Sequence, residues 1–220
     1  QNLFKEADEN LDFSMSNLIL NGPKEDLDLT INTQPAIFLL SYSIFKLIRD
    51  EFGIELSKAN FFAGHSLGEY TALACAGSLS FSDTLRILKI RGSAMQSSVP
   101  KGIGGMVAIL GSKIELIENI IEENKNKYEC FIANDNSEGQ IVLSGNIIDL
   151  EKMMIDLKTK NIKNIKLPVS APFHCKLMNK ATTIMKEEIY KLNFAESKNT
   201  LISNVTGKEI SNSSELKSLL

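Results

Sequence analysis

One run of the sequence, Ala63-Gly64-His65-Ser66-Leu67-Gly68-Glu69-Tyr70, limits the fold of this chain more than any other feature. Its Gly-x-Ser-x-Gly spacing is that of a nucleophile elbow, in which a serine is held on a tight turn between a strand and a helix. A short apolar stretch at residues 60–63 precedes the turn, and residues 67–76 contain no helix breaker except Gly68. The run therefore predicts a strand, a sharp turn and a helix in that order.

The same run predicts a nucleophilic serine. A serine hydroxyl becomes a good nucleophile when a neighbouring base takes its proton, and imidazole is the side chain best suited to do so near neutral pH. The chain contains two histidines, His65 and His174. Because His65 adjoins Ser66, and adjacent side chains on such a turn point in different directions, we predict His174 as the base of Ser66.

Two further helices are expected on either side of this turn. Residues 33–52 have a capping residue at the start, Pro35 in the first turn, apolar residues at three- and four-residue spacing, and Gly53 as a stop. Ser82 is predicted to cap the next helix, which carries Arg91 before the pattern weakens. Taken alone, Arg91 would most simply be a solvated side chain on a helix face, and His174 a partly buried histidine in a turn.

From residue 102 the pattern changes to short strands alternating with helices. We predict strands at 105–110, 128–133, 140–145 and 162–168, and helices at 113–124 and 147–159. The order βαββαβ is that of the ferredoxin-like unit, a four-stranded sheet with two helices. Because the unit lies between Arg91 and His174, we predict that it is inserted into a larger domain. The predicted domains are residues 1–101 with 169–220, where a helix at 176–191 and a strand at 201–204 follow, and residues 102–168.

Composition argues against several classes of function. The net charge of −3 and the pI near 5.6 disfavour a general polyanion binder, so we expect no nucleic-acid partner. The apolar stretches are too short to cross a bilayer, so we expect no membrane role. Cys75, Cys130 and Cys175 are odd in number and widely spaced, which favours neither a disulfide framework nor a metal site. Cys175 is expected to be a buried free thiol rather than a nucleophile.

Five motifs together carry a resemblance to a known family. They follow one another along essentially the whole chain, and five in register are far more specific than one. They are Gly64-His65-Ser66-Leu67-Gly68-Glu69-Tyr70, Arg91-Gly92 with Met95-Gln96, residues 134–140, residues 169–174 (Val-Ser-Ala-Pro-Phe-His) and Asn204-Val205-Thr206-Gly207. In this order and spacing the chain resembles the malonyl-CoA:acyl carrier protein transacylase family.

The resemblance implies a fold and an activity. The fold would be α/β, with an α/β-hydrolase-like large domain and an inserted ferredoxin-like (βαββαβ) small domain. The activity would be ping-pong transfer of malonyl from malonyl-CoA to the phosphopantetheine thiol of acyl carrier protein, in type II fatty acid synthesis and without a cofactor. We expect a monomer whose partners are malonyl-CoA and acyl carrier protein, in a bacterial cytoplasm or in a plastid.

The resemblance also implies residue roles. Ser66 would form the malonyl ester while His174 accepts and returns the proton. Arg91 would hold the free malonyl carboxylate through two parallel hydrogen bonds that Lys cannot reproduce in that geometry. The backbone N–H of Leu67 would donate to the oxyanion. Further candidates for substrate contacts are Gln140, Phe173 and Asn204, although Gln140 is equally well explained as a turn residue that opens a strand.

Two other functions share part of this pattern. A serine esterase or thioesterase would use Ser66 and His174 but has no reason to place Arg91 against a carboxylate. A catalytically silent module that binds coenzyme A or acyl carrier protein is the alternative from another class. Members of the family usually begin with a strand and a Gly-Gln-Gly-type loop, and continue beyond the position of Leu220 to a Gln that orients the histidine. We therefore expect this chain to be a piece of a longer protein, cut at both ends.

Acyl carrier protein is acidic, so the surface of this chain that would bind it is expected to be basic. Lys160, Lys163 and Lys166, around the last strand of the predicted insert, are the candidates for this surface. For any one of these lysines taken alone, simple solvation at the surface is the better explanation.

Overall fold

The chain contains two compact units. The computed structural model describes residues 2–100, 102–169, 171–210 and 212–220, apart from the side chain of Ser57. One unit comprises Gln1–Ser93 with Ile184–Leu220, and the other comprises Ala94–Thr183. A parallel sheet in the first and an antiparallel sheet in the second confirm the predicted α/β class. The predicted domain limits stay a prediction, and Lys101 and Ser170, beside two of them, lie outside the described residues.

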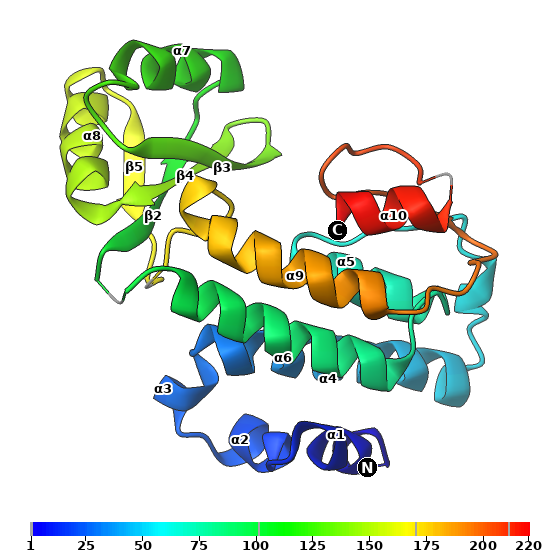
Figure 1. Cartoon of the computed structure of the whole chain (residues 1–220). Helices are drawn as coiled ribbons and strands as arrows, with labels where there is room; N and C mark the ends of the chain where they lie inside the picture. The colour runs from blue at the N-terminus through cyan, green and yellow to red at the C-terminus, as the bar shows by residue number, and fades with distance from the viewer. Residues whose placement is uncertain (1, 101, 170, 211) are drawn as a thin grey trace. The chain divides into compact units, whose positions relative to one another are not determined.

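The first unit is mostly helical (Figure 1). Its strands β1 (Phe61–Phe62) and β6 (Thr200–Leu201) pair in parallel. Its helices are α1 (Asn2–Leu11), α2 (Met15–Asn21), α3 (Lys24–Leu27), α4 (Thr30–Phe52), the short 3-10 helix η1 (Leu56–Lys58), α5 (Leu67–Cys75) and α10 (Ser213–Leu219); α6 (Phe81–Ser98) and α9 (Asn179–Lys191) continue into the other unit. Within the described residues, no helix is both long enough and apolar enough to span a membrane.

The predicted helix at 33–52 is confirmed as α4, but its start differs. It begins at Thr30, and the hydroxyl of Thr33 donates to the carbonyl oxygens of Leu27 and Leu29 rather than capping the helix. Pro35 consequently lies beyond the first turn. The end is as predicted, because Gly53 takes a left-handed conformation with φ 62° that stops the helix.

Helix α4 buries a face different from the one that its spacing suggests. Phe38 and Leu39 are fully buried in the core with α5 and α6, whereas Ile37, Leu40 and Ile44 are 46%, 50% and 48% exposed. Periodicity therefore identified the helix correctly, but the neighbouring helices decided which apolar stripe is covered.

Helix α6 also begins two residues earlier than predicted, at Phe81, and continues further, to Ser98. The cap is Ser80, whose Oγ accepts the N–H of Asp83 at 3.0 Å, so the prediction of Ser82 as the cap was wrong. The helix passes through Gly92 because that residue packs directly on α4: a Cβ at Gly92 would lie 2.4 Å from the carbonyl oxygen of Thr30. Gly92 thus weakens the helical pattern in the sequence while allowing the two backbones to touch.

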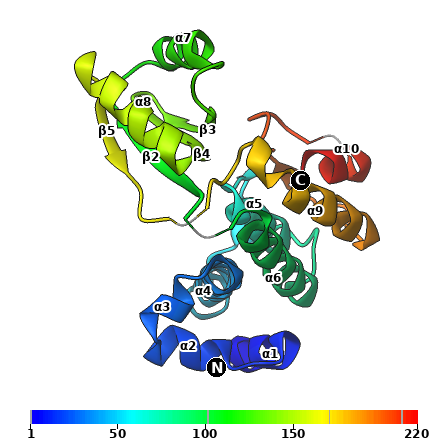
Figure 2. The same ribbon diagram turned by 60° about the vertical axis from the view of Figure 1, so that its left-hand side comes forward.

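The second unit has the predicted βαββαβ order. Its elements are β2 (Gly104–Leu110), α7 (Ile114–Asn124), β3 (Cys130–Ser137), β4 (Gln140–Asn146), α8 (Ile147–Thr159), β5 (Lys163–Lys166) and the short 3-10 helix η2 (Lys176–Met178). The sheet order is β3-β4-β2-β5 with every pair antiparallel, which is the ferredoxin-like arrangement. Helices α7 and α8 of this unit are seen beside the sheet in Figure 2. Their apolar residues Ile117, Ile120, Leu150, Met153 and Leu157 share a core with residues of the sheet.

The segment 134–140, which joins two predicted strands, is itself mostly strand. Strand β3 continues to Ser137, with Asn134 opposite Val142, and two irregularities of register accommodate the extra residues. The turn itself is limited to Glu138 and Gly139, where Gly139 has φ 80°.

Candidate active site

The elbow around Ser66 has the predicted geometry of strand, turn and helix. Strand β1 leads into it, and Ser66 stands directly before α5 with φ 53° and ψ −116°. These angles are those of the first central residue of a type II′ turn, a position that normally takes glycine. The N–H of Gly68 closes the turn on the carbonyl oxygen of His65 at 2.9 Å. A non-glycine residue in such a conformation costs about 1–3 kcal/mol and persists only where its surroundings hold it.

The two glycines of the motif differ in how much space surrounds them. A Cβ at Gly64 would lie 1.9 Å from the carbonyl oxygen of Gly68, so no larger residue fits there. A Cβ at Gly68 would meet no atom within 4 Å. The close approach of the chain to itself therefore requires Gly64 and not Gly68.

Arg91 reaches the elbow from α6. Its Nη2 donates to Ser66 Oγ at 3.0 Å, and its Nη1 donates to Gln34 Oε1 at 2.7 Å. Gln34 belongs to α4 and is 4% exposed, so it fixes one edge of the guanidinium from inside the protein. We did not identify Gln34 from the sequence, where it follows the polar residues Asn32 and Thr33 and carries no signal of its own.

The charge of Arg91 lies in a partly buried setting. Burial lowers the pKa of its guanidinium, opposed by the nearby Tyr70 and Glu69. Arginine nevertheless stays protonated in proteins. Its Cζ lies 5.8 Å from the centre of the Tyr70 ring, and burial raises the pKa of Tyr70 to about 12. None of the ion pairs among the described residues includes Arg91. Within this part of the chain, a cation that no carboxylate contacts therefore stands beside the serine hydroxyl.

Asn204 contacts the elbow although it lies 138 positions away in the sequence. Its Oδ1 accepts the backbone N–H of Ser66 at 2.7 Å, and its own N–H donates to Glu69 Oε1 at 3.0 Å. Glu69 is 6% exposed, and burial raises the pKa of its carboxyl against the opposing effects of the Asn204 N–H and of Arg91. The sequence had indicated Asn204 as a substrate contact and had not singled out Glu69.

Leu67 is the first residue of α5. Amide groups at this end of a helix have no acceptor within the helix, and the helix dipole favours negative charge there. The position suits the predicted oxyanion donor. Ser66, Leu67, Arg91 and Asn204 thus belong to the same unit, the first three within two adjacent helix segments.

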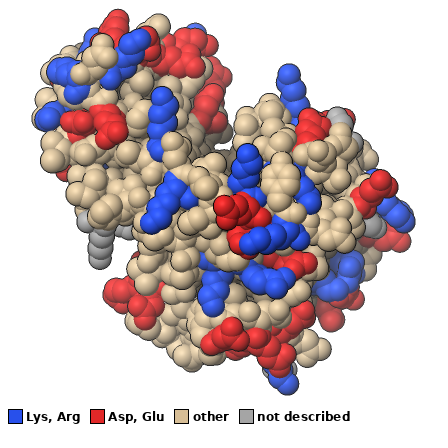
Figure 3. Space-filling view, in the orientation of Figure 1, with Lys and Arg blue, Asp and Glu red and all other residues tan. Residues whose placement is uncertain are grey.

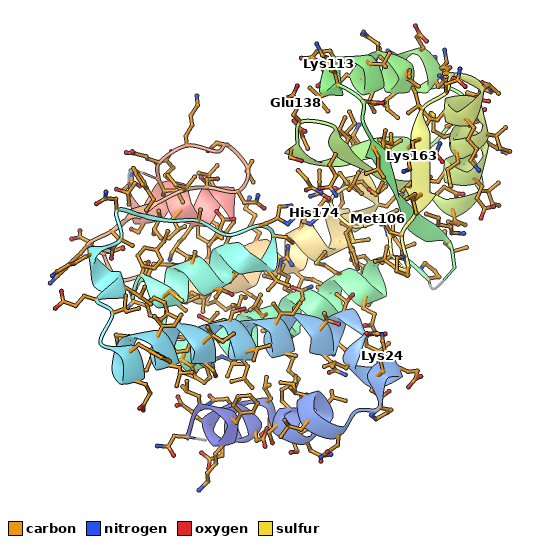
Figure 4. The ribbon with its side chains drawn as sticks, turned by 180° about the vertical axis from the view of Figure 1, so that it is seen from behind. Lys24, Met106, Lys113, Glu138, Lys163 and His174 are labelled. Carbon is orange, nitrogen blue, oxygen red and sulfur yellow. The ribbon has the colours of Figure 1, made fainter. Side chains whose placement is uncertain are left out.

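The remaining predicted residues belong to the second unit. His174 lies in the segment between β5 and α9 (Figure 4), with φ 57°, and it is exposed. Pro172 of this segment packs on the start of β2, where a Cβ at Gly104 would lie 2.2 Å from Pro172 Cδ. Phe173 is half-buried. Gln140 is exposed and opens β4, opposite Leu110 of β2.

The three predicted docking lysines are exposed in the second unit. Lys166 Nζ lies 2.8 Å from Glu151 Oε1, which offsets its charge. Blue and red side chains alternate over the face seen in Figure 3. The basic docking surface stays a prediction.

Known proteins resemble this chain closely. The family described as acyl transferase domain matches residues 3–217. The chain belongs to this family. A malonyl CoA-acyl carrier protein transacylase of Bacillus subtilis is 38% identical over 222 residues, which cover 99% of this chain and 68% of the relative. The transacylase of Escherichia coli K12 is 34% identical, covering 99% of this chain and 70% of its own.

Solved structures of malonyltransferases superpose on nearly the whole of this chain. The acyl-carrier-protein-S-malonyltransferase of Bartonella henselae superposes with a TM-score of 0.93 at 39% identity, over 99% of this chain and 70% of that one. A malonyl-transacylase solved in complex with a type II polyketide acyl-carrier protein has a TM-score of 0.92 at 32% identity, over 99% and 70%. The family resemblance predicted from the five motifs is confirmed, and the chain spans about two thirds of the length of these relatives.

Proposed function

We propose that this acyltransferase transfers malonyl from malonyl-CoA to the phosphopantetheine thiol of acyl carrier protein. The observation that carries the proposal is the partly buried guanidinium of Arg91, whose Nη2 lies 3.0 Å from Ser66 Oγ. An acyl group esterified to Ser66 would have its far end close to this cation. An acyl group that ends in a carboxylate is the one that such a site favours, through charge-assisted hydrogen bonds.

The first half-reaction forms the ester. Ser66 Oγ attacks the thioester carbonyl carbon, and His174 takes the proton of the hydroxyl. The negative charge that develops on the carbonyl oxygen is stabilised by the N–H of Leu67 and by the helix terminus of α5. The carbon–sulfur bond then breaks, and coenzyme A leaves with the proton from His174. The role of His174 rests on the sequence and on the family.

The second half-reaction repeats these steps with another thiol. The phosphopantetheine thiol of acyl carrier protein gives its proton to His174 and attacks the malonyl ester, and Ser66 recovers its proton when the ester bond breaks. The names of the relatives and the solved complex with an acyl-carrier protein support this acceptor. The reaction needs no cofactor. We further propose a monomer, acting in type II fatty acid synthesis in a bacterial cytoplasm or a plastid.

Intact mass measurement tests the proposal directly. The protein incubated with malonyl-CoA should gain one malonyl group, and addition of phosphopantetheinylated acyl carrier protein should remove it and transfer it to the carrier. The Ser66→Ala variant should gain nothing. A serine thioesterase would instead lose the adduct to water at the same rate with or without carrier protein, and a silent binding module would gain no adduct at all. Either result would refute the transferase.

A further inference from the structure

The backbone of Ser66 is held by a residue outside its own turn. The bond from Gly68 N–H to His65 O closes the turn but leaves the N–H of Ser66 pointing out of it. That N–H donates to Asn204 Oδ1 at 2.7 Å, across 138 positions of sequence. A side chain remote in the sequence therefore fixes the amide of the residue with the least favourable backbone angles in the elbow.

Asn204 is itself presented by a rigid turn. It follows β6, the strand that pairs with β1. The preceding residue, Ser203, is 1% exposed, and its Oγ accepts the N–H groups of Val205 and Thr206 at 3.1 Å and 3.3 Å. The N–H of Gly207 returns to the carbonyl oxygen of Ser203 at 2.9 Å. These bonds leave the backbone of Asn204 little freedom, which lets its side chain act as a fixed acceptor.

Glu69 links Asn204 back to the elbow by a second hydrogen bond. It lies on the first turn of α5, and its Oε1 accepts the N–H of Asn204 at 3.0 Å. The elbow thus supports Asn204 through Glu69, and Asn204 supports the elbow through Ser66. A carboxylate that is 6% exposed has few other acceptable positions, because burial away from a donor is unfavourable.

We propose that Asn204 and Glu69 are positioning residues for the nucleophile. They hold the backbone of Ser66 so that its Oγ stays beside Arg91 Nη2 and so that the next amide, the N–H of Leu67, keeps its direction. Neither residue touches the acyl group. The inference rests on the proposed role of Ser66 as nucleophile, and it replaces the substrate contact that the sequence suggested for Asn204.

Kinetics of alanine variants test the pair. Two rates are measured: the labelling of Ser66 by a fluorophosphonate, which reports the nucleophile whatever its natural acyl group, and kcat with malonyl-CoA. In Asn204→Ala and Glu69→Ala both rates should fall by about 10- to 100-fold, as small displacements of reacting groups do. KM for malonyl-CoA should change by less than about 3-fold, because Arg91 and Gln34 remain in place. The double variant should be no slower than either single one, since both act on one backbone position.

Two variants separate positioning from general stability. Glu69→Gln keeps an oxygen that can accept the Asn204 N–H, so it should restore both rates to within about 3-fold of the parent protein. Asn212→Ala removes the same kind of bond elsewhere in this unit, the 2.9 Å contact from Glu215 N–H to Asn212 Oδ1. It should lower the melting temperature while leaving labelling and kcat unchanged.

Two results would overturn the inference. One is an increase in KM for malonyl-CoA in Asn204→Ala with kcat and labelling unchanged, which would make Asn204 a substrate contact. The other is labelling at the parental rate in both alanine variants. If Glu69→Ala does not fold, Asn204→Ala and Glu69→Gln decide the matter by themselves. If the parent protein is labelled but takes up no malonyl, the transferase fails while labelling of the variants still judges the positioning pair.

Discussion

Arg91 Nη2 lies 3.0 Å from Ser66 Oγ, although the two residues come from different helix segments of the chain. Helix α6 carries a second arginine, Arg86, which differs from Arg91 in its exposure and in its partner. Arg86 is 65% exposed and pairs with Asp83 one turn away, as surface arginines commonly do. The two guanidinium groups on one helix therefore provide a test and its control.

Arg91→Ala should reduce malonyl transfer far more than acetyl transfer. Loss of hydrogen bonds to a charged group predicts about a 100-fold decrease in kcat/KM with malonyl-CoA. Arg91→Lys should recover little of it, because an ammonium group cannot make two parallel bonds to a carboxylate. Arg86→Ala should match the parent protein with both substrates. Equal losses with malonyl-CoA and acetyl-CoA would remove Arg91 from carboxylate recognition.

Gln34→Glu should introduce a carboxylate that competes with the malonyl carboxylate for Arg91. A carboxylate at this position would pair with Arg91 Nη1, where the Gln34 amide oxygen now lies at 2.7 Å. The guanidinium would then be neutralised before malonyl arrives, so KM for malonyl-CoA should rise by about 10-fold or more. Acetyl-CoA, which lacks the carboxylate, serves as the control substrate. An unchanged KM for malonyl-CoA would contradict this view of Gln34.

Gly64→Ala and Gly68→Ala should have opposite effects on stability. A Cβ added at Gly64 would lie 1.9 Å from the Gly68 carbonyl oxygen, so the turn must open, with a loss of about 1–3 kcal/mol or more in the free energy of unfolding. At Gly68 a Cβ meets nothing within 4 Å, and alanine in a helix gains about 0.5–1 kcal/mol over glycine. Chemical denaturation of both variants measures this. Equal destabilisation of the two would mean that the elbow needs both glycines.

Glu69→Gln should gain stability relative to the parent protein as the pH rises. Burial raises the pKa of Glu69 above its ordinary 4.5, so the folded protein holds this proton more tightly than the unfolded chain. The contribution of Glu69 to stability is therefore greatest at low pH, and it declines from pH 4.5 upward through the raised folded value. Glutamine does not titrate. The difference in free energy of unfolding, variant minus parent, should grow between about pH 4 and about pH 8. A difference that shrinks over this range would mean that the charge of Arg91 lowers the pKa of Glu69 more than burial raises it.

Much of the fold was predictable because its signals are local. Helix α8 has the predicted bounds, residues 147–159, and the βαββαβ order of the second unit follows from short strands and helices that alternate in the sequence. The caps of α4 and α6 were not predicted correctly. Helix α4 begins after Leu29, whose side chain cannot cap a helix, and α6 is capped by Ser80 although Ser82 lies only two residues further on. The choice among nearby starting points depends on the packing of neighbouring segments, which the local sequence does not report.

The sequence by itself predicted the chemistry: a serine on a glycine-bounded turn, one histidine available as its base, and an arginine embedded in a family motif. Only the tertiary structure shows which distant residues contact Ser66 and Arg91. Gln34 contacts Arg91 across 57 positions and Asn204 contacts Ser66 across 138, distances over which sequence periodicity carries no information. Such contacts arise when helices and strands pack together, because packing brings polar groups from distant parts of the sequence within hydrogen-bond distance.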